Sequence, residues 1–417
     1  MRKKLLYVAY HYPPIIGSSG VHRTVSFVKH LAKSGWDVDV LTCKKLAYDK
    51  VDTKHSKQEP ACANVIRCFA FNTQRHLSIN GKYLSWLAQP DNWQSWILTG
   101  VLRASARLIR VKVDLIVSSY PITSAHIIAY ILHRMFKVPW VADLRDPMLQ
   151  DDYPQNKTKR KIFKWIESKI IKHCCFAVVT TEGAKRLYQS KYPEIPESFW
   201  NLIPNGFDED LIESLNPHQP NQPKLTLLHS GLIYPSERDP CQLFAAISSM
   251  KHDGSISCST FELRLRACGH EHIYRPILKK LDIEDVVKIG GLITFAEAIK
   301  EMQAASALLV IQAENCNYQI PAKVYEYIRI GKPILGLTPS KGDTGMLLSK
   351  IPQAILAPLD DTYMIKTAIC ELIDKVNTGA FTFLSEHEVK RYSRQSQALE
   401  FDKLLTEVVS IPEGKFS

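Results

Sequence analysis

Short apolar runs alternate with amphipathic segments along most of this 417-residue chain. The run LLYVAY at residues 5–10 predicts a buried strand, residues 20–35 predict an amphipathic helix ending at a glycine, and residues 37–42 predict a second strand. The same order returns between residues 114 and 190 and again between 225 and 337. Such alternation is typical of parallel sheets covered by helices on both faces. We therefore predict an α/β fold.

The length of the chain predicts two domains, because one hydrophobic core seldom serves more than about 250–300 residues. The composition, 45% hydrophobic and 23% charged, is that of an ordinary globular protein. ESLNPHQPNQPK is rich in Pro, Asn and Gln and predicts a linker at 213–224. We place an N-terminal domain at 1–212 and a C-terminal domain at 225–384. A final helical segment, 385–417, is expected to return to the N-terminal domain.

The formal net charge of +11 favours a polyanionic partner such as a phosphate ligand or an anionic membrane. No helix-turn-helix, zinc-finger or RNP-like pattern occurs, so we expect no nucleic acid partner. Ten cysteines occur without a CxxC pair, which indicates reduced thiols in the cytoplasm and no metal site. The DVD sequence at 37–39 imitates a metal-binding pair but alternates with valine as a strand does. No apolar run reaches the length of about 18 residues that a membrane helix needs.

The segment QIPAKVYEYIRIGKPILGL predicts a short helix between Pro321 and Gly331, followed by a strand. It places Glu326 among apolar neighbours, where a charge needs a partner. An ion pair with Arg329 at i, i+3 is one account of this glutamate, and a ligand is the other.

Two loops have the composition of anion-binding turns. PPIIGSSGVHR follows the first strand and carries Gly17 and Gly20, which let backbone N–H groups approach an anion. HSGLIYPSERDP carries Gly231 and places Arg238 just before a helix, where a cation could hold a phosphate. A structural turn and a surface ion pair, respectively, are the alternatives.

Taken in order, several stretches resemble GT-B-fold glycosyltransferases of family 4 over nearly the whole chain: YHYPPIIGSSGVHRTVSFVKHLAKSGWDVDVLT, PWVADLRDPM, LIPNGFDED, HSGLIYPSERDPCQLFAAI and IPAKVYEYIRIGKPIL. The resemblance implies two Rossmann-like domains facing across a cleft, with a C-terminal helix crossing back to the N-terminal domain. It implies transfer of a sugar, with retention of configuration, from a nucleotide-diphosphate donor held mainly by the C-terminal domain. It implies no metal or other cofactor. By family frequency the donor is a UDP-sugar.

The same resemblance assigns roles to the motif residues. Glu326 would bind the ribose hydroxyls of the donor, since a carboxylate accepts hydrogen bonds from two adjacent hydroxyls. Arg238 would neutralise the charge on the leaving phosphate, and the loop of Gly17 and Gly20 would lie near the diphosphate. Four residues at the helix N-terminus would bind the same phosphates: Ile320, Pro321, Ala322 and Lys323.

The chain departs from the family pattern at three places. The first motif glutamate, eight positions before the second, is Tyr318 here, and PAKVYEY resembles a subgroup that lacks it. No lysine follows Arg238 at the usual distance, so Lys323 is the candidate substitute. Many members carry a histidine in the N-terminal domain that touches the donor, whereas ADLRDPM offers Asp143, Arg145 and Asp146 in the comparable loop. Asp146, before a proline that favours extended backbone, is the candidate that orients or deprotonates the acceptor hydroxyl, with a turn-stabilising role as the alternative. We expect His126 to be an ordinary helix residue.

The acceptor side is less defined. Residues 75–98 carry Trp86, Trp93 and Trp96, which would either form an acceptor wall or pack in the core. Residues 157–173 predict a basic amphipathic helix that would dock on the sheet, with its lysines free to face an anionic membrane.

We therefore predict a retaining glycosyltransferase that moves a sugar to a saccharide or lipid-linked acceptor in cell-surface polysaccharide synthesis. We expect it in the cytoplasm or peripherally on the inner face of the cytoplasmic membrane. Two alternatives remain. A GT-B sugar-nucleotide epimerase or hydrolase would convert the donor without an acceptor, and a non-catalytic sugar-nucleotide-binding protein would bind the donor without turnover.

Overall fold

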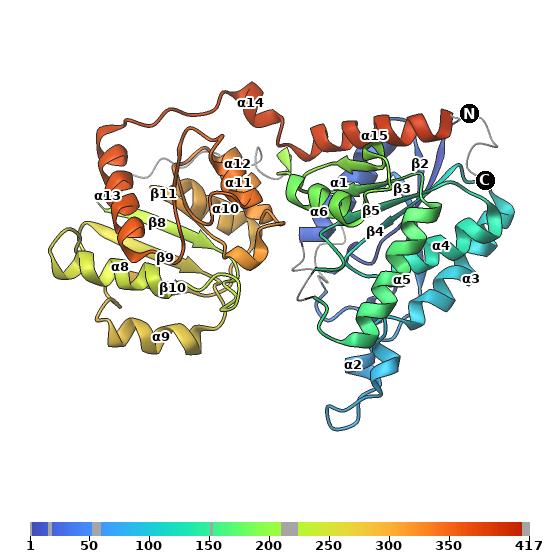
Figure 1. Cartoon of the computed structure of the whole chain (residues 1–417), viewed down its shortest axis with the longest axis horizontal. Coiled ribbons are helices and arrows are strands. Elements are labelled where there is room, and N and C mark those ends of the chain that lie inside the picture. The colour runs from blue at the N-terminus through green and yellow to red at the C-terminus, as the bar shows by residue number, and fades with distance from the viewer. Residues whose placement is uncertain (1, 16–18, 52–59, 151–152, 210–223, 411–417) are drawn as a thin grey trace. The chain divides into compact units, whose positions relative to one another are not determined.

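The computed structural model describes five stretches of the chain (Figure 1), residues 2–15, 19–51, 60–150, 153–209 and 224–410. The chain divides into two compact units, unit 1 (Met1–Asn205 with Arg394–Ser417) and unit 2 (Gly206–Ser393). The borders of the units thus fall at Asn205 and Arg394, where the sequence placed them at 212 and 385. The expected linker, except for Lys224, lies outside the described residues.

Unit 1 is built on a seven-stranded parallel sheet with the order β3-β2-β1-β4-β5-β6-β7. Its strands are β1 (Lys4–Val8), β2 (Asp37–Cys43), β3 (Ala63–Cys68), β4 (Leu115–Ser119), β5 (Trp140–Arg145), β6 (Phe176–Val179) and β7 (Trp200–Leu202). Its helices are α1 (Ser19–Lys33), α2 (Thr73–His76), α3 (Ser95–Arg110), α4 (Ser124–Phe136), α5 (Lys157–His173), α6 (Glu182–Lys191) and α15 (Arg394–Ser410). Helices α3 to α6 cover one face, and α1 and α15 cover the other.

The C-terminal helix α15 completes the core of unit 1. It packs beside α1 (Figure 1), and the rings of Phe401 and Phe27 lie with their centroids 4.9 Å apart. Trp36 Nε1 donates to Asp402 Oδ1 at 2.6 Å, which fixes the helix at its edge. Burying a phenylalanine contributes about 1.5–3 kcal/mol, so α15 is an integral part of this unit.

Unit 2 is built on a six-stranded parallel sheet with the order β10-β9-β8-β11-β12-β13. Its strands are β8 (Leu225–Ser230), β9 (Phe261–Arg266), β10 (Val287–Gly290), β11 (Ala307–Ile311), β12 (Ile334–Leu337) and β13 (Ala354–Ala357). Its helices are α8 (Cys241–His252), α9 (Glu271–Lys280), α10 (Phe295–Ala304), α11 (Ala322–Ile330), α12 (Asp343–Leu348), α13 (Thr362–Thr378) and α14 (Glu386–Lys390). Helices α8, α9 and α13 cover one face, and α10, α11, α12 and α14 the other.

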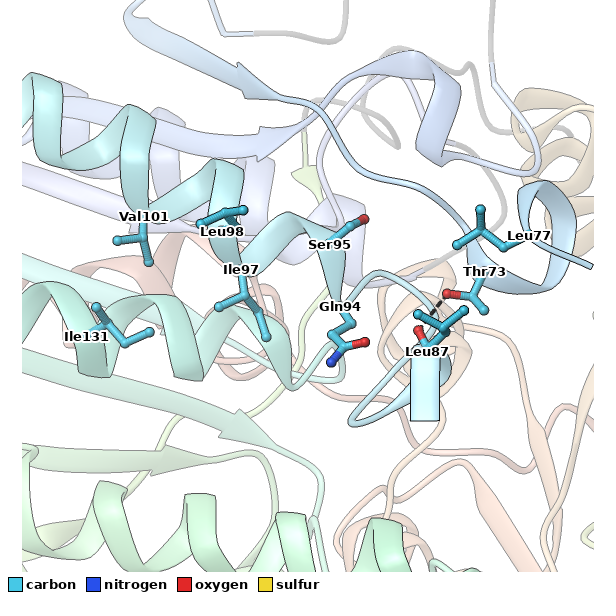
Figure 2. A pocket seen from close by; sticks show the side chains of 9 residues that line it. All are labelled: Thr73, Leu77, Leu87, Gln94, Ser95, Ile97, Leu98, Val101 and Ile131. Atoms are coloured by element: carbon cyan, nitrogen blue, oxygen red, sulfur yellow. Dashed lines mark hydrogen bonds between the residues drawn. The ribbon is translucent and has the colours of Figure 1, made fainter. Parts of the chain in front are cut away.

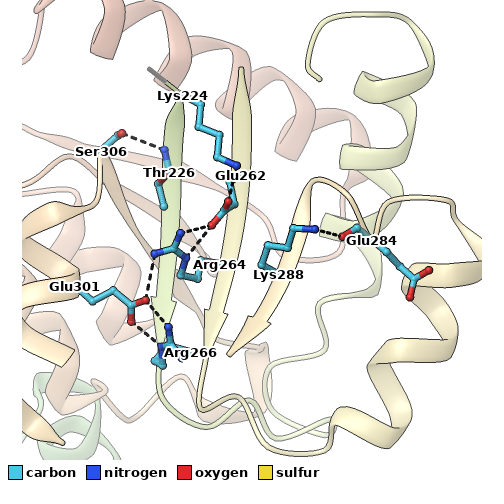
Figure 3. A network of polar contacts seen from close by, with 9 residues as sticks. All are labelled: Lys224, Thr226, Glu262, Arg264, Arg266, Glu284, Lys288, Glu301 and Ser306. Atoms are coloured by element: carbon cyan, nitrogen blue, oxygen red, sulfur yellow. Dashed lines mark hydrogen bonds and ion pairs between the residues drawn. The ribbon is translucent and has the colours of Figure 1, made fainter. Parts of the chain in front are cut away.

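Strand β9 shows how side-chain alternation sets the two faces of the sheet. Its three apolar residues are almost fully buried, because they face the core under α8 and α9. The three residues between them are charged and form a network on the opposite face (Figure 3). There Arg266 and Arg264 lie 2.7 and 3.3 Å from the carboxylate of Glu301 on α10. The network joins β9 to α10, and the buried Ile299 and Met302 of that helix belong to the apolar core of the same face.

The structure tests two sequence-based expectations about helices, one by side-chain burial and one by the helix bounds. Helix α5 packs its apolar face on the sheet, as expected, since Phe163, Ile166 and Ile170 are each at most 2% exposed. The helical segment expected from 385 onwards is two helices, α14 and α15. Within the described part of the chain, no helix combines the length and the apolar character that crossing a bilayer requires.

Candidate functional site

In unit 2 the candidate residues meet beside the carboxyl ends of β8 and β11. These adjacent central strands are where the strand order reverses, the position at which open α/β sheets bind ligands. Gly231 directly follows β8 in the chain, and the connection after β11 leads through a short 3-10 helix (Glu314–Cys316) to α11. The predicted residues of both loops are thereby brought to one edge of the sheet.

Lys323 and His229 form the centre of this site. The Nζ atom of Lys323 lies 3.0 Å from Nε2 of His229. The other ring nitrogen, Nδ1, lies 3.0 Å from the carbonyl oxygen of Leu309, which can only accept, so Nδ1 carries the proton and Nε2 accepts. Burial and then the charge of Lys323 hold the pKa of His229 well below its usual range. The imidazole is therefore a neutral support for the lysine.

The environment of Lys323 disfavours its charge. Burial and the nearby Arg238 lower the pKa of Lys323 to about 7, and Glu326 opposes this shift. Gly231 leaves the space that the lysine occupies, since a Cβ atom there would lie 3.1 Å from Nζ, and its φ of +114° is disfavoured for other residues. A bound anion would restore the charge of the lysine.

Arg238 supplies a second cation to this site. Its Nη1 donates to the carbonyl oxygen of Leu232 at 3.0 Å, and its guanidinium lies 5.6 Å from the ring centre of Tyr234. Its Nε is buried without a hydrogen-bond partner. Two cations with one donor unsatisfied define a site suited to an anion.

Helix α11 positions the remaining candidates. It begins at Ala322 with Pro321 as its N-cap, so the unpaired N–H groups of its first turn include those of Ala322 and Lys323. Pro321 has no N–H, which corrects the expectation that it offers a backbone donor to a phosphate. Glu326 is half-buried one turn further on, and Ile320 packs beside the core under α11.

Two neighbours of this helix bear on the alternatives. The guanidinium of Arg329 forms an ion pair with Glu386 of α14 at 3.4 Å. Tyr318, at the position of the first motif glutamate, is 38% exposed in the loop before the helix. An accessible aromatic ring there suits contact with a sugar or base better than a structural role.

Unit 1 carries its own polar cluster where β1, β4 and β5 end. Asp143 is fully buried and accepts from Arg23 Nε at 3.2 Å, Arg23 Nη2 at 3.1 Å and Ser119 Oγ at 3.1 Å. Arg23 lies on α1 and also donates to the carbonyl oxygens of Ile203 and Pro204. This buried pair anchors α1 to the sheet.

Arg145, at the end of β5, lies over the first turn of α1. A Cβ atom at Gly20 would collide with its guanidinium, so a larger residue there would displace the Arg145 side chain. Arg145 is 7% exposed, donates through Nη1 to the carbonyl oxygen of Tyr120 at 3.2 Å, and leaves its Nε without a partner. Burial and Arg145 lower the pKa of His11 to about 3, so the imidazole beside them is neutral. A cation next to a helix N-terminus favours an anion at this place.

The other candidate residues of unit 1 differ in their position and burial. Asp146 follows β5 and is half-buried; burial raises its pKa, and Arg145 and Arg23 partly offset the rise. His126 is fully buried on α4 with Nδ1 2.7 Å from Ser118 Oγ, as expected of an ordinary helix residue. Gly17 lies outside the described residues. The described residues contain no group of three or more His, Cys, Asp or Glu side chains placed to hold a metal ion.

The tryptophans of residues 75–98 differ in how deeply they are buried. Trp96 is fully buried, Trp93 is half-buried and donates to the carbonyl oxygen of Ala47 at 2.8 Å, and Trp86 is 62% exposed. Only Trp86 of these three is therefore open to a ligand. His229 and His11 were missed by the sequence analysis, although a histidine at the carboxyl end of an apolar run, as in LTLLHS, is a usable signal.

Comparisons with known proteins agree with this arrangement. Residues 19–206 match the family model of the glycosyl transferase 4-like domain. Among solved structures, sucrose-phosphate synthase from Thermosynechococcus elongatus superposes with a TM-score of 0.68 at 15% identity, over 98% of this chain and 99% of that one. The lipopolysaccharide glycosyltransferase WaaG gives 0.59 at 13% identity, over 98% and 100%. The lipopolysaccharide outer core galactosyltransferase WaaB gives 0.61 at 12%, over 97% and 99%. No curated protein matches the chain.

These findings confirm the predicted fold, and the family match over residues 19–206 supports the predicted class of enzyme. The likeness over the whole chain shows the GT-B fold with two Rossmann-like domains. The family match places unit 1 among the glycosyl transferase 4-like domains. The chain thus has the GT-B fold and carries a glycosyl transferase 4-like domain over residues 19–206.

Proposed function

We propose that this enzyme transfers a sugar, with retention of configuration, from a nucleotide-diphosphate donor to a saccharide or lipid-linked acceptor in cell-surface polysaccharide synthesis. The observation that carries the proposal is the convergence of Arg238 and Lys323 around the space beside Gly231. Both cations would neutralise the charge that develops on a diphosphate leaving group, without a metal ion.

The donor would lie along helix α11. The diphosphate binds Arg238, Lys323 and the free N–H groups of the first turn. Glu326, one turn further on, accepts hydrogen bonds from the ribose hydroxyls. Tyr318 takes the place of the first motif glutamate beside the donor sugar. UDP is proposed as the nucleotide from the family resemblance alone.

Unit 1 would hold the acceptor. Asp146 orients or deprotonates the acceptor hydroxyl, and burial raises its pKa in the direction that suits a general base near neutral pH. Arg145 and the first turn of α1 offer a second anion site for a phosphate of either substrate. A peripheral position on an anionic membrane would bring a lipid-linked acceptor to this unit.

Nucleotide release from a panel of nucleotide sugars, with and without membrane lipid extract, tests the proposal. The wild type should release nucleotide only with an acceptor, and Glu326→Gln should lose this activity. Glu371→Gln, an exposed glutamate paired with Lys375 on α13, is the matched control and should behave as wild type. Conversion of the donor without acceptor would favour an epimerase or hydrolase, and binding without turnover a non-catalytic protein. The anomeric configuration of the product, from NMR, tests retention.

A further inference from the structure

Exposed apolar side chains are concentrated on one part of unit 1. Of the 23 large apolar side chains exposed in the described residues, nine lie between residues 69 and 110. Six of these are between 61% and 79% exposed: Ile79, Leu84, Trp86, Leu98, Leu102 and Ile109. We call these six residues, with the groove described below, the α2–α3 surface. Large apolar side chains exposed at this density in one part of a fold mark an interaction site.

The geometry of this surface is fixed by hydrogen bonds and helix periodicity. Leu98, Leu102 and Ile109 share one side of α3 at i, i+4 and i+11. Ile79 and Lys82 exchange both backbone hydrogen bonds, at 2.8 and 3.0 Å, across a tight turn. This turn follows α2 and projects away from the sheet of unit 1 in Figure 1. It holds Ile79 outward, where the side chain contributes nothing to the core.

A groove of about 410 Å³ opens between α2, α3 and the 3-10 helix Ser85–Ala88 (Figure 2). Six apolar side chains form most of its wall: Leu77, Leu87, Ile97, Leu98, Val101 and Ile131. Its polar residues, Thr73, Gln94 and Ser95, lie between the apolar residues of α3 on one side and Leu77 on the other in Figure 2. The volume falls in the range of small-molecule sites, and the mostly apolar lining suits an acyl chain.

The chain segment that forms this surface carries an excess of positive charge. Between residues 69 and 113 the sequence contains six Lys and Arg residues and a single acidic residue, Asp91. Asp91 is buried and accepts from Ser124 at the start of α4, through N at 2.8 Å and Oγ at 2.9 Å. Lys82, Arg103 and Arg110 are exposed. Arg107 is paired with Asp39 of β2, and the exposed cations give the surface a positive field.

We propose that the α2–α3 surface docks on an anionic lipid bilayer and takes one acyl chain into its groove. Exposed leucines, a tryptophan and flanking cations are the combination that binds the boundary between headgroups and acyl chains. Helix α5 does not make this contact through its apolar face, which is buried, although its lysines add to the field. The inference shares the membrane location of the proposed function but none of its chemistry, so either stands if the other fails.

Vesicle co-sedimentation of the full chain tests the inference, with neutral phosphatidylcholine and with mixtures containing phosphatidylglycerol. Wild type should bind the anionic vesicles and release in high salt. The Leu98→Gln, Leu102→Gln double variant should bind at least about tenfold more weakly, because two leucines no longer enter the lipid. The Arg103→Gln, Arg110→Gln variant should lose about tenfold or more on anionic vesicles only.

The matched control is Leu292→Gln with Tyr363→Gln, two side chains of unit 2 that are 86% and 75% exposed. It should bind vesicles as the wild type does. All variants replace exposed groups, so circular dichroism and thermal unfolding should be unchanged. Brominated acyl chains should quench the fluorescence of wild type more than that of Trp86→Phe. Equal vesicle binding by wild type and the leucine variant would overturn the proposal. If the wild type does not bind vesicles but self-associates, and the leucine variant does not self-associate, the proposal is overturned, and the surface instead binds a second copy of this chain.

Discussion

Lys323 Nζ lies 3.0 Å from His229 Nε2, so the ammonium group on α11 donates a hydrogen bond to the imidazole at the end of β8. The imidazole is held as an acceptor by its bond to the Leu309 carbonyl, and it can orient the lysine without competing for charge. Arg238 disfavours the lysine charge from the other side. The site is thus a cation centre that becomes fully charged when an anion arrives.

Nucleotide binding should become weaker as the pH rises above 7. Burial and Arg238 lower the Lys323 pKa to about 7 in the free protein, and a bound diphosphate raises it again. Binding therefore takes up a proton, and the affinity for UDP should fall by up to about tenfold per pH unit between 7 and 9. Calorimetry in buffers of different ionisation enthalpy measures this uptake. A Lys323→Met variant should bind more weakly and show no such slope, and an unchanged slope would contradict the assignment.

The same Lys323→Met substitution should stabilise the protein near neutral pH. The folded-state pKa is lowered, so the unfolded chain binds more protons between about pH 7 and 10.5, and wild-type stability rises with pH across that window. Removing the group should raise the free energy of unfolding at pH 7 by about 2 kcal/mol after discounting for its partial exposure. Urea unfolding at pH 7 and 10 measures this gain, which should shrink at the higher pH.

Glu326→Gln should remove discrimination between ribose and 2′-deoxyribose. A charged acceptor of two hydroxyl hydrogen bonds contributes about 1.5–3 kcal/mol, so wild type should bind UDP about 10- to 100-fold more tightly than its 2′-deoxy analogue. The variant should bind both analogues similarly. If the wild type binds UDP and its 2′-deoxy analogue equally well, the ribose does not contact Glu326.

Gly231→Ala should cost both stability and nucleotide affinity. The φ of +114° strains an alanine by about 1–3 kcal/mol, and the new methyl would press on the Lys323 ammonium. Gly254→Ala is the control, since its φ is +78° with nothing within 4 Å. That variant should lose stability only, whereas equal nucleotide binding by both variants would argue against the role of Gly231.

Asp146→Asn should lower the turnover number of sugar transfer by about 10²- to 10⁴-fold if the carboxylate is the general base. The Michaelis constant for the donor should hardly change, because the residue lies in the other unit. Steady-state kinetics with a defined acceptor separates the two constants. A loss confined to donor affinity would remove Asp146 from the acceptor side.

The strands and helices could be predicted from the sequence wherever a segment kept a single pattern of apolar residues, either that of a strand or that of a helix. The buried run ALLVI of β11 and the helix of α11 between Pro321 and Gly331 lie as expected. Helix α3 was not predicted, because the tryptophan-rich segment before it mixes a turn, a 3-10 helix and the start of α3. Which tryptophan is buried depends on tertiary packing that no local pattern encodes.

The candidate site was predictable by residue type but not by contact. The sequence analysis singled out Gly231 and Lys323 separately. It could not predict that Gly231 leaves space for the Lys323 side chain, because this contact depends on the pairing of β8 with β11. The arginine at the end of β5 reaches the start of α1 for the same reason. Long-range strand order, which sets these distances, leaves no trace in short windows of sequence.

The placement of α15 in unit 1 has a consequence for biosynthesis. The ribosome delivers every strand of the first sheet, and then the whole of unit 2, before it releases the helix that carries Phe401. Until then the face around Phe27 has no cover, whereas unit 2 can already close. The nascent chain therefore carries an incomplete first domain through about half of its synthesis. A truncation that removes α15 would leave the domain incomplete permanently.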